Sequence, residues 1–546
     1  MTGQDGVARR RSIVVGAALG GILVVAATLR FWALDMGLPN PAARPDEREM
    51  LSHTIAFAAG DLNPRWFVYP NLFMYAAWLW IELGLTLRRL WVPTAPYAQL
   101  MRGDLPLVLL YGRTMSAVVG TATVAIVYQI GRAVDGRRLG LVAAALLATN
   151  FLHVRDSHAL KTETLLAAGT LVSLWLLARR QEHPGLGRAA LAGVAIGITA
   201  GFKYPGLFLL ATAWIVEILA SPRRGLRRAL PGFPLLVLGA TAVVTFLATS
   251  PFLVLDFGRA KDTAAFLSLA LYATRSEDPR PAGGLLTTIL WWLRSRAFWY
   301  HLAASLRHGS GIVLALATPV ALVRAVRDRA HPFFVLAAVH CIVHYLIAGA
   351  SPVHLARYLT PLMPVLMLLV AALVTSLTAR IAGPARRDAA TAILTLLLVA
   401  EPAASSIAAN VISARTDTRV LATRWMTDHL PAGTVVAQLG DAVVPIANPE
   451  LPPGVRRAVL PAGATDLAAA GVTFVTTHEH QLPFSQLDPR QLQALGPHLA
   501  LLAEFSPYVG PPAGVFERED AYYVPFWSFS GVVRPGPLVR IYAYRP

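Results

Sequence analysis

Two adjacent acids, Asp46 and Glu47, stand a few residues beyond the first long hydrophobic segment, residues 13–34. Single charged residues are common just outside a membrane span. An acid pair followed by an amphipathic stretch and many further hydrophobic segments is much rarer, and ionisable groups at such positions usually mark function. The pair therefore indicates catalysis at the membrane surface on a substrate that is delivered in lipid.

Further polar residues stand at the ends of hydrophobic segments far apart in the sequence. The topology that the basic loops predict places them on the same side of the membrane as Asp46, so we expect them to converge on one site. The alternative is a scatter of interfacial anchors whose charged ends reach water. The candidate residues are Tyr69, His158, Glu163, Lys203, Tyr204, His354, Arg357 and Tyr358.

The composition of the 546-residue chain is that of a polytopic membrane protein. Its residues are 55% hydrophobic and only 14% charged, and the mean hydropathy is +0.53. Hydrophobic runs of about 18 or more residues, each long enough to cross a bilayer, recur along most of the chain. The first run follows Arg9 to Arg11 without a small-residue cleavage site, so it is predicted to be a retained span.

The net charge of +17 does not indicate a nucleic-acid partner, because its distribution follows the hydrophobic segments. Basic residues collect in short loops that alternate with those segments, as the positive-inside rule requires. The single cysteine, Cys341, excludes an intrachain disulfide bond. The basic loops are residues 9–11, 132–138, 179–188, 223–228, 324–329 and 380–387.

Anchoring these loops in the cytoplasm predicts eleven transmembrane helices, a cytoplasmic amino terminus and an outer carboxyl terminus. Segments 139–153 and 205–220 are short for a full span and are expected to tilt or to be helped by flanking turns. The predicted spans are residues 12–34, 107–130, 139–153, 164–178, 188–202, 205–220, 230–249, 298–323, 332–350, 358–379 and 389–408.

The stretch 70–91 is hydrophobic enough to cross, but a span there would invert every later loop. It is therefore predicted to lie in the interface or to re-enter the outer leaflet, within a first outer loop of about 35–105. A second outer loop covers about 250–297.

The chain is predicted to have two domains, a transmembrane domain of residues 1–409 and a small extracytoplasmic α/β domain of residues 410–546. The second domain is punctuated by Pro and Gly and mixes helical with strand-like periodicity. Helices are expected at Thr418–His429 and Gln491–Leu502, and strands at Thr434–Ala437, Val472–Thr476 and Leu538–Tyr544.

Several short motifs, in this order and topological placement, resemble the multispan lipid-donor glycosyltransferases of superfamily C. The branch that they resemble comprises protein O-mannosyltransferases and aminoarabinose transferases. The resemblance covers nearly the whole chain and includes residues 417–433 as the start of an outer domain. The motifs are Pro45-Asp46-Glu47, Tyr69-Pro70-Asn71-Leu72, GRTMS at 112–116, SHALKTE at 157–163, GFKYPG at 201–206 and ARYLTP at 356–361.

The resemblance implies that Asp46 is the catalytic base, which takes the proton of an acceptor hydroxyl. Glu47 would position the acceptor or hold Asp46, and Glu163 would contact the sugar or the acceptor. Attack from the face opposite the leaving polyprenyl phosphate implies inversion in one displacement.

The phosphate of the leaving group calls for positive charge, for which Arg357 and Lys203 are the candidates. Lysine is scarce in this chain, and Lys203 interrupts a hydrophobic run. The sequence departs from the aminoarabinose branch at Tyr69, where a lysine is expected before the proline. A hydroxyl hydrogen bond is the most that this position can give to a phosphate.

The sequence requires no cofactor. It leaves open whether the protein binds a divalent metal. His153, His158 and His354 stand near the acids, but no close-spaced ligand pattern compels a metal site. The two histidines of His478-Glu479-His480 would share one face of a strand, and we interpret them as a solvated strand end. No Asp-x-Asp pair and no Walker-type lysine supports a nucleotide donor.

The sequence thus predicts an inverting glycosyltransferase at the outer face of a prokaryotic cytoplasmic membrane, with a polyprenyl-phosphate sugar as donor. The acceptor is a hydroxyl of a protein, a lipid or a glycan. A secondary transporter is an alternative from another class, although no related halves with matching broken helices are visible. A polymerase or ligase of lipid-linked glycans is the other alternative.

Overall fold

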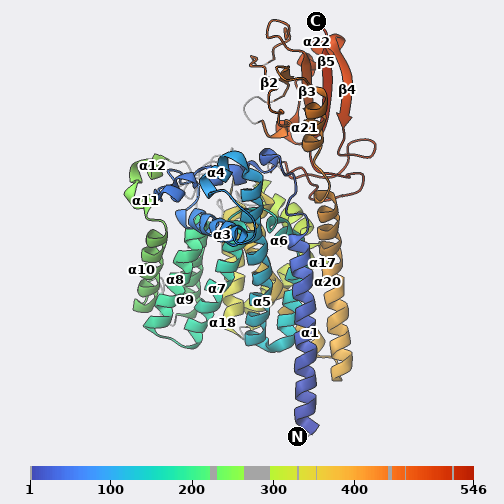
Figure 1. The fold of residues 1–546 in the computed structure, drawn as a ribbon. Coiled ribbons are helices and arrows are strands. Elements are labelled where there is room, and N and C mark those ends of the chain that lie inside the picture. Colours follow the sequence, from blue (N-terminus) through green and yellow to red (C-terminus); the bar gives the residue numbers. More distant parts are fainter. Residues whose placement is uncertain are drawn as a thin grey trace, which may run out of the picture. The chain divides into compact units, whose positions relative to one another are not determined.

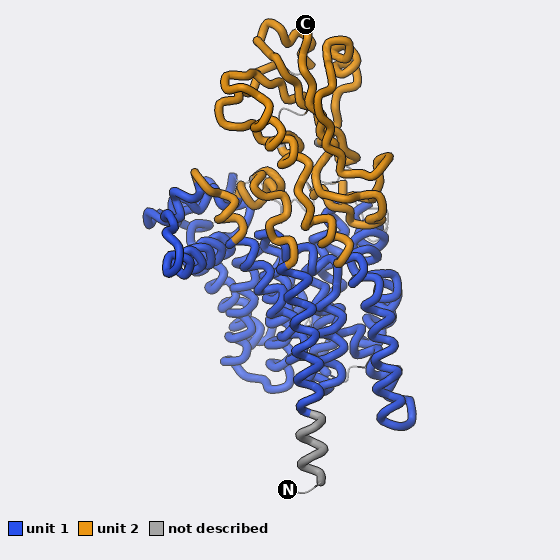
Figure 2. Tube along the Cα trace, turned by 45° about the vertical axis from the view of Figure 1, so that its right-hand side comes forward, with its two compact units in different colours: residues 1–31, 50–101, 111–406 blue, residues 32–49, 102–110, 407–546 orange. Residues whose placement is uncertain are grey.

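The computed structural model divides into two compact units (Figure 2). The first unit comprises Met1–Phe31, Met50–Met101 and Tyr111–Ser406, and the second comprises Trp32–Glu49, Arg102–Leu110 and Ile407–Pro546. The structure describes residues 3–221, 230–262, 296–328, 331–351, 353–440, 445–461, 463–518, 520 and 522–546.

The regular structure of the first unit's described residues is all helical, as expected for apolar segments that must satisfy their own backbone hydrogen bonds (Figure 1). Short η segments connect or extend its helices: η2 (Ile55–Ala59), η3 (Tyr204–Leu207), η5 (His301–Leu306) and η6 (Ala356–Leu362). Its helices are α1 (Gly3–Phe31), α3 (Asn71–Arg89), α4 (Tyr97–Gly103), α5 (Leu105–Thr149), α6 (Phe151–Asp156), α7 (Glu163–Glu182), α8 (Leu186–Phe202), α9 (Phe208–Ala220), α10 (Phe233–Thr249), α11 (Phe252–Leu255), α12 (Phe257–Asp262), α15 (Arg296–Tyr300), α16 (Arg307–Ser310), α17 (Ile312–Asp328), α18 (Pro332–Ala348), α19 (Met363–Ala379) and α20 (Pro384–Ser413).

Four helical stretches of the described residues are long and apolar enough to cross a membrane, judged by length and composition alone. A bent pair, Arg296–Ser310 with Ile312–Arg327, makes a fifth if it is counted as one span. The four stretches are Ser12–Phe31, Leu105–Thr149, Ala356–Ala379 and Pro384–His429.

The predicted span 298–323 is not one straight helix, because the chain bends by 116° between α16 and α17. The break lies at Gly311, whose φ of +86° favours glycine and ends α16. The side chain of Glu401 accepts the first backbone N–H of α17, from Ile312, at 2.7 Å. That carboxylate also pairs with Arg307 on the other side of the bend.

Helix α3 occupies most of the stretch that was predicted to lie in the interface, residues 70–91. Figure 1 shows α3 crossing the long axes of α7 and α8 instead of running parallel to them. Its assignment to the membrane interface stays a prediction. Most of the predicted outer loop 250–297 lies outside the described residues.

Glycines on α8 bring this helix into close contact with α10. A Cβ atom on Gly193 would lie 2.3 Å from the carbonyl oxygen of Leu238, and one on Gly197 would lie 2.5 Å from that of Ala242. Small residues allow helix backbones to approach in this way. The contact fixes α8, and therefore the position of Lys203, which follows directly after it.

The second unit holds a five-stranded mixed sheet in the order β2-β1-β3-β5-β4. The central strand β3 pairs in parallel with β1 and antiparallel with β5, so the parallel and antiparallel halves meet there. The strands are β1 (Val435–Gln438), β2 (Arg456–Arg457), β3 (Phe474–Glu479), β4 (Leu499–Phe505) and β5 (Leu538–Tyr544).

Alternating side chains of the sheet build two apolar clusters. Val436, Val539 and Ile541 pack with Met426 of α21 (Thr418–His429). Ala437 and Val475, which have the opposite parity on their strands, pack with Leu495 of α22 (Pro489–Leu495). A helical protein with a small carboxy-terminal sheet is therefore confirmed.

The predicted helix 491–502 is wrong in its second half. Helix α22 ends at Leu495, and Pro497 follows in a single 3-10 turn. The chain then continues as β4, in which Leu499 pairs with Tyr544 of β5. Because a strand partner was available, tertiary pairing overrode the amphipathic pattern.

A buried ion pair anchors the start of α21. Arg419 donates from Nη2 and Nε to the two carboxylate oxygens of Asp417, at 2.6 and 2.9 Å, and the same carboxylate caps the helix. Burial by itself would lower the pKa of Arg419, but Asp417 raises it above its ordinary value. The guanidinium also lies 4.6 Å from the ring centre of Tyr523.

The interpretation of His478 and His480 as a solvated strand end is wrong, because both side chains are buried. The ring of His480 packs against Phe516 and Tyr523, with centroid distances of 4.3 and 4.9 Å. Burial lowers the pKa of His480 to about 3, so the histidine is neutral in this core.

Candidate functional site

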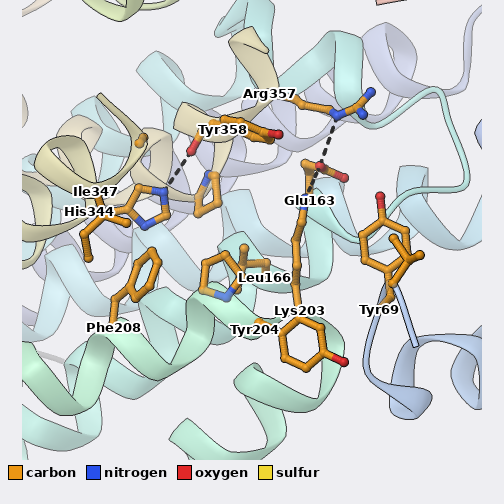
Figure 3. Close-up of a pocket in the computed structure, with 14 residues that line it drawn as sticks. Tyr69, Glu163, Leu166, Lys203, Tyr204, Phe208, His344, Ile347, Arg357 and Tyr358 are labelled. Carbon is orange, nitrogen blue, oxygen red and sulfur yellow. Dashed lines mark hydrogen bonds and ion pairs between the residues drawn. The ribbon is translucent and has the colours of Figure 1, made fainter. Parts of the chain in front are cut away.

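A pocket of about 210 Å³ in the first unit gathers most of the predicted site residues (Figure 3). Its charged lining consists of one carboxylate, Glu163, and two cations, Lys203 and Arg357. The rest of the lining is largely apolar and includes Leu166, Phe208, Ile347, Ala348 and Pro361. The pocket is therefore amphipathic, with a cationic excess at one side.

Glu163 lies between the two cations. Its Oε1 atom accepts a hydrogen bond from Lys203 Nζ at 2.6 Å and lies 3.6 Å from Arg357 Nε. The carboxylate is 2% exposed, against 13% for the lysine and 12% for the arginine side chain. Lys161, which is also buried, acts on the same carboxylate charge. A buried carboxylate with cations on several sides is held ionised and fixes their positions.

Chain breaks at the ends of apolar helices position these groups. Glu163 is the first residue of α7, where a negative charge is favoured by the helix dipole. Lys203 lies between α8 and η3 with an extended backbone, and Pro205 prevents α8 from continuing. Arg357 belongs to η6, which leads into α19.

Two aromatic rings surround the ammonium group of Lys203. Its Nζ atom lies 5.5 Å from the ring centre of Tyr69 and 5.7 Å from that of Tyr358. Both distances are within the range of cation–π attraction. The sequence predicted only a hydroxyl contact for Tyr69, and the ring contact depends on the approach of two distant segments.

Tyr204 connects the first loop to the turn after α8. Its hydroxyl donates to the carbonyl oxygen of Phe67 at 2.9 Å, and its ring packs on Phe246. Because this hydroxyl is engaged, Tyr204 lines the pocket with its ring and holds the segment that carries Tyr69. The predicted contact of Tyr204 with the substrate stays a prediction.

His344 lines the pocket but was not among the residues predicted for the site. Its Nε2 atom donates to the carbonyl oxygen of Tyr358 at 2.8 Å, so it supports the backbone beside Arg357. A polar residue near the end of a hydrophobic run was the only signal for it in the sequence.

Other predicted residues lie elsewhere. His158 is buried with Nδ1 2.8 Å from the carbonyl oxygen of Val154, and the ring of His354 lies 5.9 Å from that of Tyr300. Neither is among the described residues that line the pocket.

Asp46 and Glu47 lie in the first turn of α2 (Pro45–Ser52), where Glu47 is fully buried and Asp46 half-buried. Both belong to the second unit, so their convergence with the pocket stays a prediction.

Within the described residues, no group of three or more His, Cys, Asp or Glu side chains is arranged to hold a metal ion. Two buried acids of the first unit, Glu163 and Asp156, use their oxygens otherwise. Glu163 is paired with cations, and Asp156 accepts a hydrogen bond from Thr360.

Residues 109–254 match the family model of dolichyl-phosphate-mannose-protein mannosyltransferases. No curated protein sequence matches the chain. The solved structures that share its fold include two with a bound lipid phosphate. One is ArnT from Cupriavidus metallidurans bound to undecaprenyl phosphate, with 15% identity over 97% of both chains and a TM-score of 0.53. The other is the archaeal oligosaccharyltransferase AglB from Archaeoglobus fulgidus, in complex with an inhibitory peptide and a dolichol-phosphate. Its identity is 12% over 86% of this chain and 70% of that chain, and its TM-score is 0.50.

The family match covers the segment from α5 to α11, which includes Glu163 and Lys203. The fold match to ArnT extends over nearly the whole chain. The resemblance to the membrane glycosyltransferases of superfamily C, which the motifs predict, is therefore confirmed.

Proposed function

We propose that this protein is an inverting glycosyltransferase that moves a sugar from a polyprenyl-phosphate donor to an acceptor hydroxyl at a membrane surface. The observation that carries the proposal is the amphipathic pocket. Lys203 and Arg357 supply positive charge for a phosphate, and the wall formed by Phe208, Ile347 and Pro361 suits an isoprenoid chain. A water-soluble anion has no apolar part that could contact that wall.

The two cations suit a leaving phosphate better than a bound neutral sugar. As the bond between the anomeric carbon and the phosphate oxygen breaks, negative charge grows on the phosphate. A lysine and an arginine fixed by a buried carboxylate meet that charge without reorganising. Glu163 thus acts first as a positioning residue for the two cations through Oε1. Its Oε2 atom accepts a hydrogen bond from the hydroxyl of Thr162 at 3.2 Å and can accept a second one from a sugar hydroxyl.

Asp46 serves as the base in this proposal. It removes the proton of the acceptor hydroxyl as the acceptor oxygen forms its bond to the anomeric carbon. The carbon–oxygen bond to the phosphate breaks on the opposite face, so the configuration inverts and polyprenyl phosphate is released. Glu47, buried beside Asp46 on α2, orients the base.

The ligands of the two related structures support a lipid-phosphate donor. The ArnT structure contains undecaprenyl phosphate, and the AglB structure contains a dolichol-phosphate together with a peptide. The acceptor is a hydroxyl of a protein, a lipid or a glycan. Membrane lipid surrounds the enzyme.

The experiment is an assay of the purified protein with polyprenyl-phosphate sugars, in which released polyprenyl phosphate is measured. Asp46→Asn should lower the rate by about 10²- to 10⁴-fold, the usual contribution of a general base, while undecaprenyl phosphate still binds. Asp61→Asn is the matched control, because Asp61 is an exposed acid of the same loop that pairs with Arg65. Full activity of Asp46→Asn would exclude the assigned base.

A further inference from the structure

A second cavity lies at the opposite end of α18 from the candidate site. The last turns of α18 contribute His344 and Ala348 to the candidate pocket, whereas its start contributes His331 and Phe334 to the second cavity. The second cavity has a volume of about 340 Å³ and lies among α5, α17, α18 and α19. Its location separates it from the chemistry described above.

Two opposite charges line this cavity. Arg324 of α17 is half-buried, and Asp135 stands exposed at the break within α5. Two further polar residues, His331 and Ser376, line the cavity. His331 uses both ring nitrogens: Nδ1 accepts from the backbone N–H of Phe333 at 3.1 Å, and Nε2 lies 2.7 Å from Glu182. The hydroxyl of Ser376 donates to the carbonyl oxygen of Leu373 at 2.8 Å. The charged lining of the cavity therefore consists of one cation and one carboxylate.

The remaining lining is largely apolar and includes Val134, Phe334 and Leu369. Next to it, α17 exposes a stripe of large apolar side chains at helical spacing: Val313, Leu316, Val320 and Val323. A stripe of this kind is the face that a membrane helix turns toward lipid. The cavity thus borders a lipid-facing helix surface. A membrane lipid can therefore reach it more directly than a water-soluble ligand can.

The arginines of the first unit gather at this same end of the helices. Arg179 and Arg180 close α7, whose first residue is in the candidate pocket, and Arg380 follows α19. The positive-inside rule assigns such an end to the cytoplasmic face, where phospholipid headgroups meet basic side chains.

We propose that this cavity is a binding site for a phospholipid whose headgroup carries a phosphate and a primary ammonium group, as in phosphatidylethanolamine. Arg324 binds the phosphate by charge-assisted hydrogen bonds, and Asp135 accepts from the ammonium. The apolar lining contacts the glycerol and the first part of an acyl chain. Such a lipid holds α5, α17, α18 and α19 together at the end remote from the candidate site.

The test is native mass spectrometry of the full-length protein released from nanodiscs. The nanodiscs contain phosphatidylethanolamine, phosphatidylglycerol or phosphatidylcholine in graded amounts, and the retained lipid gives an apparent Kd. Arg324→Gln should weaken retention of phosphatidylethanolamine by about tenfold or more, the effect of losing one charge-assisted hydrogen bond. Arg327→Gln is the matched control, because Arg327 is exposed on the same helix and does not line the cavity. It should leave retention unchanged.

Two further variants keep the test independent of the arginine. Asp135→Asn should abolish the preference for phosphatidylethanolamine over phosphatidylglycerol, because only the former offers an ammonium group. Ala372→Phe should fill the cavity and exclude the lipid without changing any charge. Equal retention of all three lipids by the unaltered protein, or equal losses in Arg324→Gln and Arg327→Gln, would overturn the proposal. So would unchanged retention in a folded Ala372→Phe variant.

Discussion

Lys203 Nζ lies 2.6 Å from Glu163 Oε1, across the interface between the start of α7 and the end of α8. Both side chains are nearly or fully buried, and a second cation, Arg357, approaches the same carboxylate oxygen. The pair therefore fixes a lysine in an apolar setting, with its ammonium group directed into a pocket (Figure 3).

Glu163→Gln should destabilise the first unit, because it leaves Lys203 and Arg357 close together without a counter-charge. Removing one partner of a buried pair costs about 3–5 kcal/mol. The midpoint of thermal unfolding in detergent should fall clearly, and Lys203→Met in the same chain should restore part of the loss. Asp388→Asn breaks an exposed pair with Arg138 and is the control, with an expected cost of about 1 kcal/mol or less. Additive losses in the double variant would show that the two side chains do not interact.

Tyr204→Phe should reduce transfer through position and not through chemistry. The variant loses only the hydrogen bond to the carbonyl oxygen of Phe67, worth about 0.5–1.5 kcal/mol, and keeps the ring that lines the pocket. The segment that carries Tyr69 should then become more mobile, which hydrogen exchange of residues 65–72 would detect. If exchange and activity both match the unaltered protein, the hydroxyl has no positioning role.

Asp417→Asn should unfold the second unit at a much lower denaturant concentration than any exposed charge change. Its partner Arg419 is 1% exposed, so the variant leaves a buried guanidinium without its carboxylate, at about 3–5 kcal/mol. Glu504→Gln breaks a half-exposed pair with Arg540 on the same unit and should cost about 1 kcal/mol or less. Hydrogen exchange of strands β3 and β5 in the full-length protein distinguishes the two variants, because protection should fall much further in Asp417→Asn than in Glu504→Gln. Similar protection in both variants would contradict the structural role of Asp417.

The local hydrophobic pattern was enough to predict those helices and strands whose apolar residues recur at the spacing of the element that they form. Helix α21 has the predicted bounds, and β1, β3 and β5 lie where short apolar runs alternate. The failures come from tertiary contacts. Strand β4 depends on β5, some forty residues later, and the bend at Gly311 depends on Glu401, ninety residues away.

The same distinction holds for the candidate site. Glu163, Lys203 and Arg357 could be predicted to gather because each stands at one end of a hydrophobic run, and the run lengths place those ends on one side. Helix packing decides which atoms meet, so the ring contacts of Lys203 and the support from His344 could not be predicted. The hydrogen bond from Tyr204 to Phe67 could not be predicted either, since nothing in its sequence context indicates Phe67.

The affinity of the purified protein for undecaprenyl phosphate tests the central claim most directly. Lys203→Gln and Arg357→Gln should each weaken it by roughly ten- to a hundredfold, which corresponds to a charge-assisted hydrogen bond of about 1.5–3 kcal/mol. Arg357→Lys should recover only part of the loss, because an ammonium group cannot make the two-pronged contact of a guanidinium. Arg65→Gln, an exposed arginine of the first loop, should have no effect. Unchanged affinity in both Gln variants, with the protein still folded, would contradict a lipid-phosphate donor in this pocket.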